Sequence, residues 1–152
     1  MAIGETVVTV IGTVVSELSR RKLSGGVSVT SFWMRSTERR RDRDSGAWVD
    51  GRQLAVKVSC WRALAESVHG SLGKGDPVIV TGRLYTGEAE VAGQQRAVPE
   101  LEAFAVGPNL SRCSALVRRP AQGRGEQRAV APRQPEVQQA GMCRTGAREG
   151  SA

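Results

Sequence analysis

The stretch that decides the fold is RQLAVKVSCWRALAESVHGSLGKGDPVIVTGRLY, residues 52–85. Residues 52–61 alternate between apolar and polar side chains, which is typical of a strand with one buried face. Over residues 62–72 the apolar side chains recur at helical spacing, and the glycines and Asp-Pro pair of GKGDP then predict a helix end and a turn. Residues 78–85 predict another strand. The stretch therefore predicts a short helix between two strands.

Three further segments predict strands before and after this unit. Residues 5–16 (ETVVTVIGTVVS) are apolar on both faces, and residues 27–37 (VSVTSFWMRST) follow a Ser-Gly-Gly turn signal. The polar sequence GEAEVAGQQR at 87–96 predicts a loop before a last strand over 98–106. Five strands with one short helix between the third and the fourth is the order of an OB-fold, a five-stranded Greek-key barrel of the all-β class. Gly82 is expected to mark a bulge or a sharp bend.

The chain is predicted to contain one domain and a C-terminal tail. A length of 152 residues suits one domain with a core, which we assign to residues 1–110. Residues 120–152 hold three prolines, five glycines and five glutamines, so this basic tail is predicted to be disordered. Residues 1–110 hold fourteen Lys/Arg against twelve Asp/Glu, whereas residues 111–152 hold eight Arg against three Glu. The positive balance favours polyanionic partners.

Several classes of protein and site find no support in the sequence. No window of about 18 apolar residues predicts a membrane span, and the first residues lack the pattern of a secretory signal. The three cysteines are far apart, which suggests neither a disulfide framework nor a metal pair, and a cytoplasmic location is the default. His69, the only histidine, has no Cys or Asp at the spacing of a triad or metal site. We expect no enzymatic activity, no metal and no cofactor.

Side-chain alternation along three strands predicts a polar face that carries both cations and aromatic rings. The opposite, apolar faces hold Phe32, Met34, Leu54, Val56, Val58, Cys60, Val78, Val80 and Leu84. The polar faces pair a cation with a ring in each strand: Arg35 with Trp33, Lys57 with Trp61, and Arg83 with Tyr85. Such a surface suits single-stranded nucleic acid, because cations follow phosphates while rings stack on bases for roughly 1–3 kcal/mol each. The alternative is that the rings lie in a subunit interface or beneath loops.

Residues 39–48, RRRDRDSGAW, connect the second and third strands and predict a hairpin arm. Continuing the alternation places Arg39, Arg41 and Arg43 on the side of Trp33. Four arginines outnumber two aspartates in this run, which favours contact with phosphates, although the aspartates would repel them. The alternative is a solvated loop with its own Arg–Asp pairs, and exposed pairs contribute only about 0–1 kcal/mol.

The order of motifs resembles the bacterial single-stranded DNA-binding protein family over about residues 5–110. The match includes VTVIGTV, GGVSVTSF, DSGAWVDG, CWRALAE and, most specifically, KGDPVIVTGRL a helix length after it. The sequence GPNL at 107–110 fits the end of the domain in actinobacterial members. The resemblance implies an OB-fold homotetramer that binds single strands on aromatic residues without sequence preference. It also implies a role in DNA replication, recombination or repair, and a cytoplasmic, nucleoid-associated location.

The chain departs from the family pattern at several positions. The family commonly has aromatic residues where Ala55 and Arg41 stand, so Arg41 is expected to exchange a base contact for a phosphate contact. Trp61 matches a family stacking position, and Trp48 lies beside the arm. The chain ends CRTGAREGSA, without the family's acidic tip, as a paralogous second copy would, so tail-mediated recruitment of repair enzymes is not expected. Residues 111–119 fall where mycobacterial-type members have an extra strand that clasps a neighbouring subunit.

We therefore predict sequence-independent binding and protection of single-stranded DNA. Two alternatives stay open: a degenerate paralogue that acts mainly as an oligomerisation or interaction subunit, and an RNA-binding OB-fold protein. The predicted stacking residues are Trp61, Trp33, Trp48 and Tyr85. The predicted phosphate contacts are Arg35, Arg39, Arg41, Arg43, Lys57, Arg62, Arg83 and Arg96.

Overall fold

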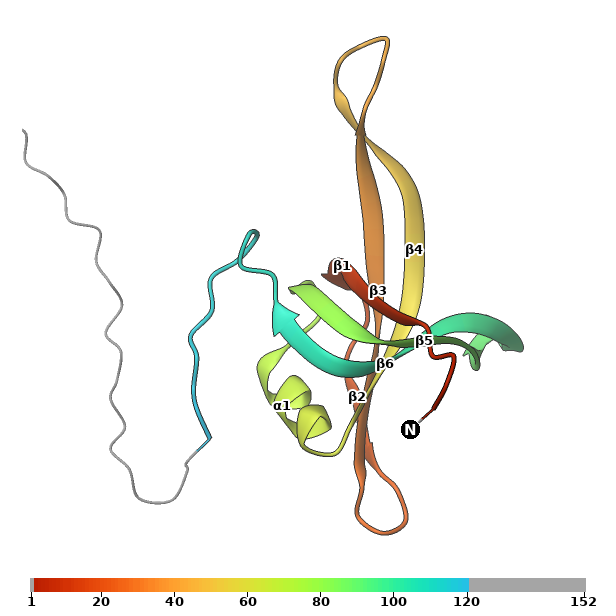
Figure 1. Ribbon diagram of the computed structural model, residues 1–152, viewed down its shortest axis with the longest axis vertical. Coiled ribbons are helices and arrows are strands. Elements are labelled where there is room, and N and C mark those ends of the chain that lie inside the picture. The colour runs from red at the N-terminus through yellow and green to blue at the C-terminus, as the bar shows by residue number, and fades with distance from the viewer. Residues whose placement is uncertain (1, 121–152) are drawn as a thin grey trace, which may run out of the picture. The chain divides into compact units, whose positions relative to one another are not determined.

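Six strands and one helix make up the part of the chain that the structure, a computed structural model, describes, which is residues 2–120 (Figure 1). The elements are β1 (Val7–Val14), β2 (Ser19–Lys22), β3 (Ser28–Arg41), β4 (Trp48–Trp61), α1 (Ala63–Ser71), β5 (Pro77–Val91) and β6 (Gln94–Pro108). The sheet order is β1-β5-β6-β4-β3-β2, and β1 also pairs with β3, which closes the sheet into a barrel. The predicted all-β OB-fold with one short helix is confirmed.

β2 is the strand that the sequence did not predict. Its four residues, SRRK, are all exposed, so they show no alternation of apolar and polar side chains. They pair antiparallel with the first residues of β3, from Ser19 opposite Ser31 to Lys22 opposite Ser28. This strand therefore forms through backbone pairing with β3, and its own side chains bury no face.

Residues 87–96, which the sequence predicted to form a loop, instead form the end of the β5–β6 hairpin, so this prediction is wrong. β5 continues to Val91 and β6 begins at Gln94, and the two strands pair along this whole length. The turn residues Ala92 and Gly93 have φ angles of 52° and 77°, the left-handed geometry that a tight two-residue hairpin requires. Sequence reasoning missed the hairpin because its side chains are mostly small or polar, which strand propensity disfavours.

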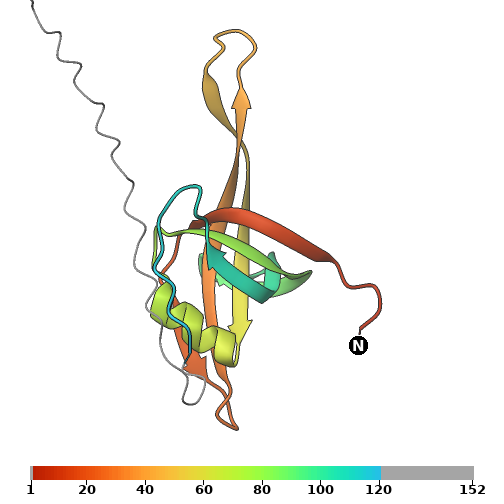
Figure 2. The same ribbon diagram turned by 60° about the vertical axis from the view of Figure 1, so that its left-hand side comes forward.

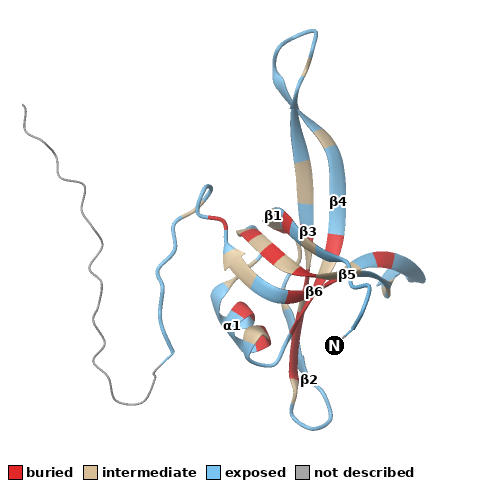
Figure 3. Ribbon diagram, viewed as in Figure 1, coloured by how far each residue is buried: buried red, intermediate tan, exposed pale blue. Residues whose placement is uncertain are grey.

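The barrel core is built from the apolar faces that alternation predicted (Figure 3). α1 adds Ala65 and Val68 to it. Leu54 was expected on the same buried face but is 42% exposed, because β4 extends beyond the barrel at this position. The large side chains with almost no exposure are Val14, Thr30, Phe32, Met34, Val56, Val58, Cys60, Val78, Val80 and Leu101.

A bulge between β5 and β6 lies where the sequence predicted one. The register shifts by one residue between Thr81 and Gly82, so that Phe104 of β6 is the extra residue. A Cβ on residue 82 would collide with the carbonyl oxygen of Glu102 in the neighbouring strand. Glycine is required here because the two backbones approach more closely than any side chain allows.

One carboxylate ties α1 to the strands beside it. Ser28 of β3 donates a hydrogen bond to Glu66 of α1, and Nη1 of Arg20 in β2 lies 2.8 Å from Glu66 Oε2. The bond from Ser28 is the main cause of the lowered pKa of Glu66, and Arg20 lowers it further. The ionised form of Glu66 is therefore favoured in the folded chain.

Glu66→Gln is expected to lower stability at pH 7 more than in acid. Because the pKa of Glu66 is lower in the folded than in the unfolded chain, its stabilisation is complete above the ordinary value of 4.5 and is lost as the pH falls below it. Thermal melts of both proteins at pH 7 and at about pH 3.5 measure this, and the gap in Tm should narrow in acid. An equal gap at both pH values contradicts the prediction; Glu88→Gln, on the exposed part of β5, is the control.

The segment after β6 contains no strand over residues 111–120 in this single chain. The predicted clasp over 111–119 needs a neighbouring subunit, so it stays a prediction, as does the domain limit at residue 110. A compact unit ends at Val117. Of the tail predicted from residue 120, residues 121–152 lie outside the described residues. Within the described part of the chain, no helix has the length and apolar character needed to cross a bilayer.

Candidate nucleic-acid interface

Four neighbouring strands each contribute one side chain to a row across the barrel surface. Trp33 of β3 is paired with Lys57 of β4. Lys57 is paired in parallel with Glu100 of β6, which is paired in turn with Tyr85 of β5. Paired residues share a face of the sheet, so this cross-strand row brings three predicted site residues together. Sequence reasoning missed Glu100, because the parallel β4–β6 pairing joins segments that are far apart in the chain.

A second set of side chains lies on the same face, nearer to α1. Trp61 of β4 is paired with Val29 of β3, which is paired with Arg21 of β2. Arg62 follows Trp61 directly, with a φ of 58°, and its side chain is exposed at the start of α1. Arg21 is a cation that sequence reasoning missed, because β2 itself was not predicted.

The four predicted stacking rings differ in exposure. Trp48 is 64% exposed, Tyr85 42% and Trp61 38%, whereas Trp33 is half-buried. Burial, followed by the neighbouring Glu100, raises the pKa of Tyr85 above its ordinary value of 10, so the ring stays uncharged at neutral pH. Each ring therefore offers an uncharged surface on which a base can stack.

The arm is a long two-stranded ribbon in which β3 and β4 continue beyond the barrel (Figure 2). The register shifts between Thr37 and Arg39, which leaves Gly51 and Arg52 of β4 both opposite Glu38 of β3. The backbone N–H of Arg52 donates to the Glu38 carboxylate over 3.4 Å. This arrangement is a β-bulge, with two residues on one strand facing one residue on the other.

The β4 bulge determines which side of the arm Trp48 faces. Beyond it, Arg39 is paired with Asp50 and Arg41 with Trp48. Alternation along β3 continues to Arg41, so Arg39 and Arg41 lie on the side of Trp33, and the bulge places Trp48 on this side too. If these same residues paired in regular alternation without a bulge, Trp48 would face the opposite side of the ribbon.

The arm arginines have contacts within the arm. Arg39 Nη1 lies 2.8 Å from Asp50 Oδ1, and Arg41 Nε donates to the Gly46 carbonyl over 3.0 Å. Arg35 is exposed opposite Ala55. β3 ends at Arg41, so the alternation extended to Arg43 is wrong: Arg43 lies in the turn at the tip.

Asp42 folds the tip of the arm. Its carboxylate accepts hydrogen bonds from the hydroxyl of Ser45 over 2.8 Å and from the Ser45 backbone N–H over 3.4 Å. The bond from the Ser45 hydroxyl is the main cause of the lowered pKa of Asp42. Its negative charge is therefore engaged inside the turn, which reduces the repulsion of phosphates that the sequence suggested.

Arg83 is held by two carboxylates of the same chain. Its Nη1 lies 2.7 Å from Glu5 Oε1, and its Nη2 lies 2.7 Å from Glu102 Oε2. Glu102 and then Glu5 raise the pKa of Arg83. The predicted phosphate contact is thus a tie between the N-terminal segment, β5 and β6. Arg96, by contrast, is exposed on the β5–β6 hairpin, where its Nη2 donates to Gln94 Oε1 over 3.5 Å.

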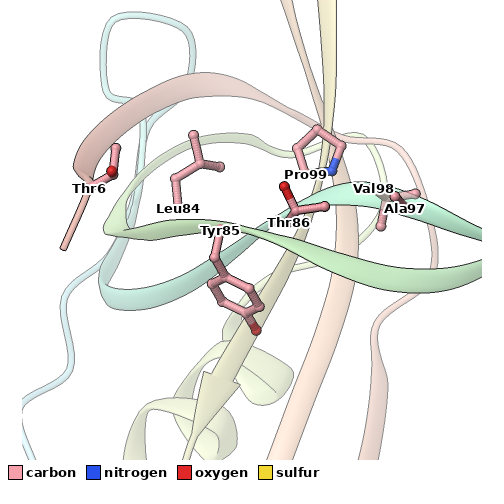
Figure 4. Close-up of a pocket in the computed structure, with 7 residues that line it drawn as sticks. All are labelled: Thr6, Leu84, Tyr85, Thr86, Ala97, Val98 and Pro99. Atoms are coloured by element: carbon pink, nitrogen blue, oxygen red, sulfur yellow. The ribbon is translucent and has the colours of Figure 1, made fainter. Parts of the chain in front are cut away.

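A shallow pocket lies beside the cross-strand row, on the other side of β5. Figure 4 shows the Tyr85 ring pointing away from Leu84 and Thr86, so the ring belongs to the face of the row. Residues 2–120 contain no group of three or more His, Cys, Asp or Glu side chains that could hold a metal ion. The pocket is lined by Thr6, Leu84, Tyr85, Thr86, Ala97, Val98 and Pro99.

Comparison with known proteins agrees with the fold. A family described as "Single-strand binding protein family" matches residues 6–108. The single-stranded DNA-binding protein of Corynebacterium glutamicum is 43% identical over 124 residues, which cover 81% of this chain and 55% of that protein. The chain thus spans about half the length of this relative. The single-stranded DNA-binding protein of Paenarthrobacter aurescens is 44% identical over 117 residues, 76% of this chain and 68% of that protein.

Two solved structures are similar over most of the chain. The small single-stranded DNA-binding protein from Streptomyces coelicolor matches with a TM-score of 0.65 and 34% identity, over 73% of this chain and 100% of that one. The second single-stranded DNA-binding protein from Mycobacterium smegmatis matches with a TM-score of 0.61 and 39% identity, over 76% and 99%. The predicted resemblance to actinobacterial proteins of this type is confirmed, and the chain belongs to the single-strand binding protein family.

Proposed function

We propose that this chain binds single-stranded DNA largely independently of sequence and so protects it during replication, recombination or repair. The observation that carries the proposal is the cross-strand row, in which Trp33 and Tyr85 lie with Lys57 on one face of the barrel. Exposed rings stack on bases for about 1–3 kcal/mol each, while cations follow the phosphates. Trp61 extends this face toward α1, and Trp48 extends it along the arm.

A cation that a carboxylate already binds is less able to contact a phosphate. The proposed phosphate contacts are therefore cations that have no such partner among the described residues. Arg83 is excluded, since Glu5 and Glu102 already balance its charge. Arg39 is shared with Asp50, so its contribution is smaller than that of a free arginine. We assign the remaining contacts to Arg21, Arg35, Arg41, Arg43, Lys57, Arg62 and Arg96.

Self-association into a homotetramer is part of the proposal. Val7 and Ile11 of β1 and Phe104 of β6 are exposed apolar side chains. β1 pairs with β5 along one edge, whereas only Thr13 and Val14 pair with β3 on the other. Exposed apolar side chains and an unpaired strand edge both favour an interface. Light scattering should give four times the chain mass of 16.2 kDa; the mass of one chain would contradict the tetramer.

Titration of the intrinsic tryptophan fluorescence with oligo-dT at low and high salt tests the binding. We expect strong quenching, with an affinity whose logarithm falls with log[salt] by about 0.7 per neutralised phosphate. A flat titration from a protein of tetramer mass would support the oligomerisation subunit instead. We further propose that the protein works in the cytoplasm, with the nucleoid, and that it binds DNA without catalysing a reaction.

Arg41→Ala is expected to make oligo-dT binding less dependent on salt. Arg41 is paired with the exposed Trp48 and is assigned one phosphate contact. Losing that contact should reduce the salt slope by about 0.7. Arg40→Ala is the matched control, because Arg40 is paired with Val49 on the opposite side of the arm. Fluorescence anisotropy of labelled oligo-dT measures both slopes. Equal slopes for the two variants would remove Arg41 from the interface.

A further inference from the structure

We propose that Glu100, with Tyr85 and Ser59 beside it, forms a subsite that prefers bases with an exocyclic amino group, and cytosine over thymine. This inference rests on the proposed function and deepens it, because it names the kind of base that one position of the interface takes. It makes the binding of single strands modestly selective, within a mode of binding that is otherwise independent of sequence.

Glu100 occupies the centre of the cross-strand row. It is paired with Lys57 on one side and Tyr85 on the other, and its side chain is half-buried. Glu102, the next residue on this face of β6, is bound by Arg83. Glu100 takes part in none of the ion pairs formed within residues 2–120, even though Lys57 is its neighbour in register. The interface therefore contains a carboxylate that no cation of this part of the chain neutralises.

Gly87 makes room for the Glu100 carboxylate. A Cβ on residue 87 would collide with Glu100 Oε2 and would lie 3.1 Å from Glu100 Cβ. The carboxylate thus lies directly over the backbone of β5, on the face from which Tyr85, two residues earlier, projects. A larger residue at position 87 would displace it, so its position beside the Tyr85 ring depends on this glycine.

Ser59 adds an unused polar group at the same place. It is only 5% exposed, and its Oγ forms no hydrogen bond of ordinary geometry within the described residues. The Ser59 hydroxyl nevertheless lies close to the Tyr85 oxygen, and this contact partly offsets the rise in the pKa of Tyr85. Ser59 is paired with Glu102 and therefore faces the same side as Lys57 and Glu100. Buried hydroxyls ordinarily have a partner, so an unpaired one at this position points to a ligand or a water.

The chemistry of this subsite discriminates between bases. The Glu100 carboxylate is hydrogen-bonded to Tyr85 but has no cation partner among the described residues. It therefore repels phosphates, and the strand must approach it with a base edge. The N4 amino group of cytosine donates hydrogen bonds that Glu and Asp side chains accept. Thymine instead has carbonyl oxygens on both sides of its single ring N–H, and these repel a carboxylate. A cytosine stacked on Tyr85 can therefore donate to Glu100, whereas a thymine in the same place meets repulsion.

The test compares oligo-dC and oligo-dT of equal length at one salt concentration. We expect the wild-type protein to bind oligo-dC about fivefold more tightly. An oligonucleotide with 2-pyrimidinone in place of cytosine lacks only the amino group and should lose this preference. Glu100→Gln should bring the dC/dT ratio close to one, mainly by strengthening the binding of oligo-dT. Glu90→Gln removes the same charge from the exposed β5–β6 hairpin and should leave the ratio unchanged.

A second variant separates the position of the carboxylate from its charge. Gly87→Ala keeps Glu100 but displaces its carboxylate, so it should also reduce the dC/dT ratio, and thermal melts establish that each variant is folded. Equal affinities of the wild type for oligo-dC and oligo-dT would overturn the subsite and leave the proposed function standing. A preference that survives Glu100→Gln would overturn the assignment to Glu100. Absence of binding to either oligonucleotide would overturn the proposed function itself.

Discussion

Gly82→Val is expected to lower the free energy of unfolding by about 3 kcal/mol or more, because the new side chain overpacks a strand contact. The atoms that the Cβ would meet belong to the backbone, at the Glu102 carbonyl and at Ala103 Cα, so no side-chain rotation relieves the collision. Residue 82 is also where the β5–β6 register shifts, so a movement of either strand disturbs the barrel. Urea unfolding followed by circular dichroism measures the change.

Gly107→Ala is the control for this substitution. Gly107 lies in β6, the strand that faces Gly82, but a Cβ on residue 107 would meet no atom within 4 Å. Its unfolding midpoint should therefore stay close to that of the wild type. If Gly82→Val unfolds at the same urea concentration as Gly107→Ala, the two backbones are not as closely packed as the structure has them.

The double variant Trp33→Ala, Trp61→Ala is expected to lose about 2–6 kcal/mol of binding free energy for oligo-dT, at least about 30-fold in affinity. Trp33 belongs to the cross-strand row and Trp61 lies on the same face nearer to α1, so we expect the two rings to stack on different bases of one strand. Anisotropy of a labelled oligonucleotide is the appropriate measurement, because the substitutions remove two of the chain's own fluorophores.

A variant that keeps the aromatic surface separates stacking from folding. Trp33→Phe, Trp61→Phe retains rings at both positions and should recover most of the affinity. Trp33 is half-buried, so thermal melts of both double variants are needed beside the binding data. If the alanine variant folds and binds oligo-dT as the wild type does, neither ring belongs to the interface.

The barrel was predictable where its elements have a clear period. The change from strand to helix spacing and back over residues 52–85 located α1 to within one residue at each end. β2 and the β5–β6 hairpin were not predictable, because their residues bury no continuous apolar face. Such strands depend on backbone pairing with a neighbour, which leaves little trace in the order of side chains.

The candidate site was predictable along each strand but not across strands. Alternation placed Trp33, Lys57 and Tyr85 on polar faces, and the register then brought them into one row. The contacts of Glu100 and Arg83 could not be predicted in this way, because they depend on which segments become neighbours in the closed barrel. The use of these residues as DNA contacts stays a prediction until the titrations are made.

The β4 bulge makes the arm sensitive to which of its two strands changes in length. Deleting Gly51 would remove the doubled position opposite Glu38 and leave Trp48 paired with Arg41, whereas deleting Arg40 from β3 would keep the bulge and turn Arg41 away from Trp48. Deleting two residues, one from β3 and one from β4 at paired positions of the arm, would shorten it while keeping the tryptophan beside the arginines. Two arms of nearly equal length can therefore present opposite chemical surfaces, and counting residues between the strands is not enough to compare them.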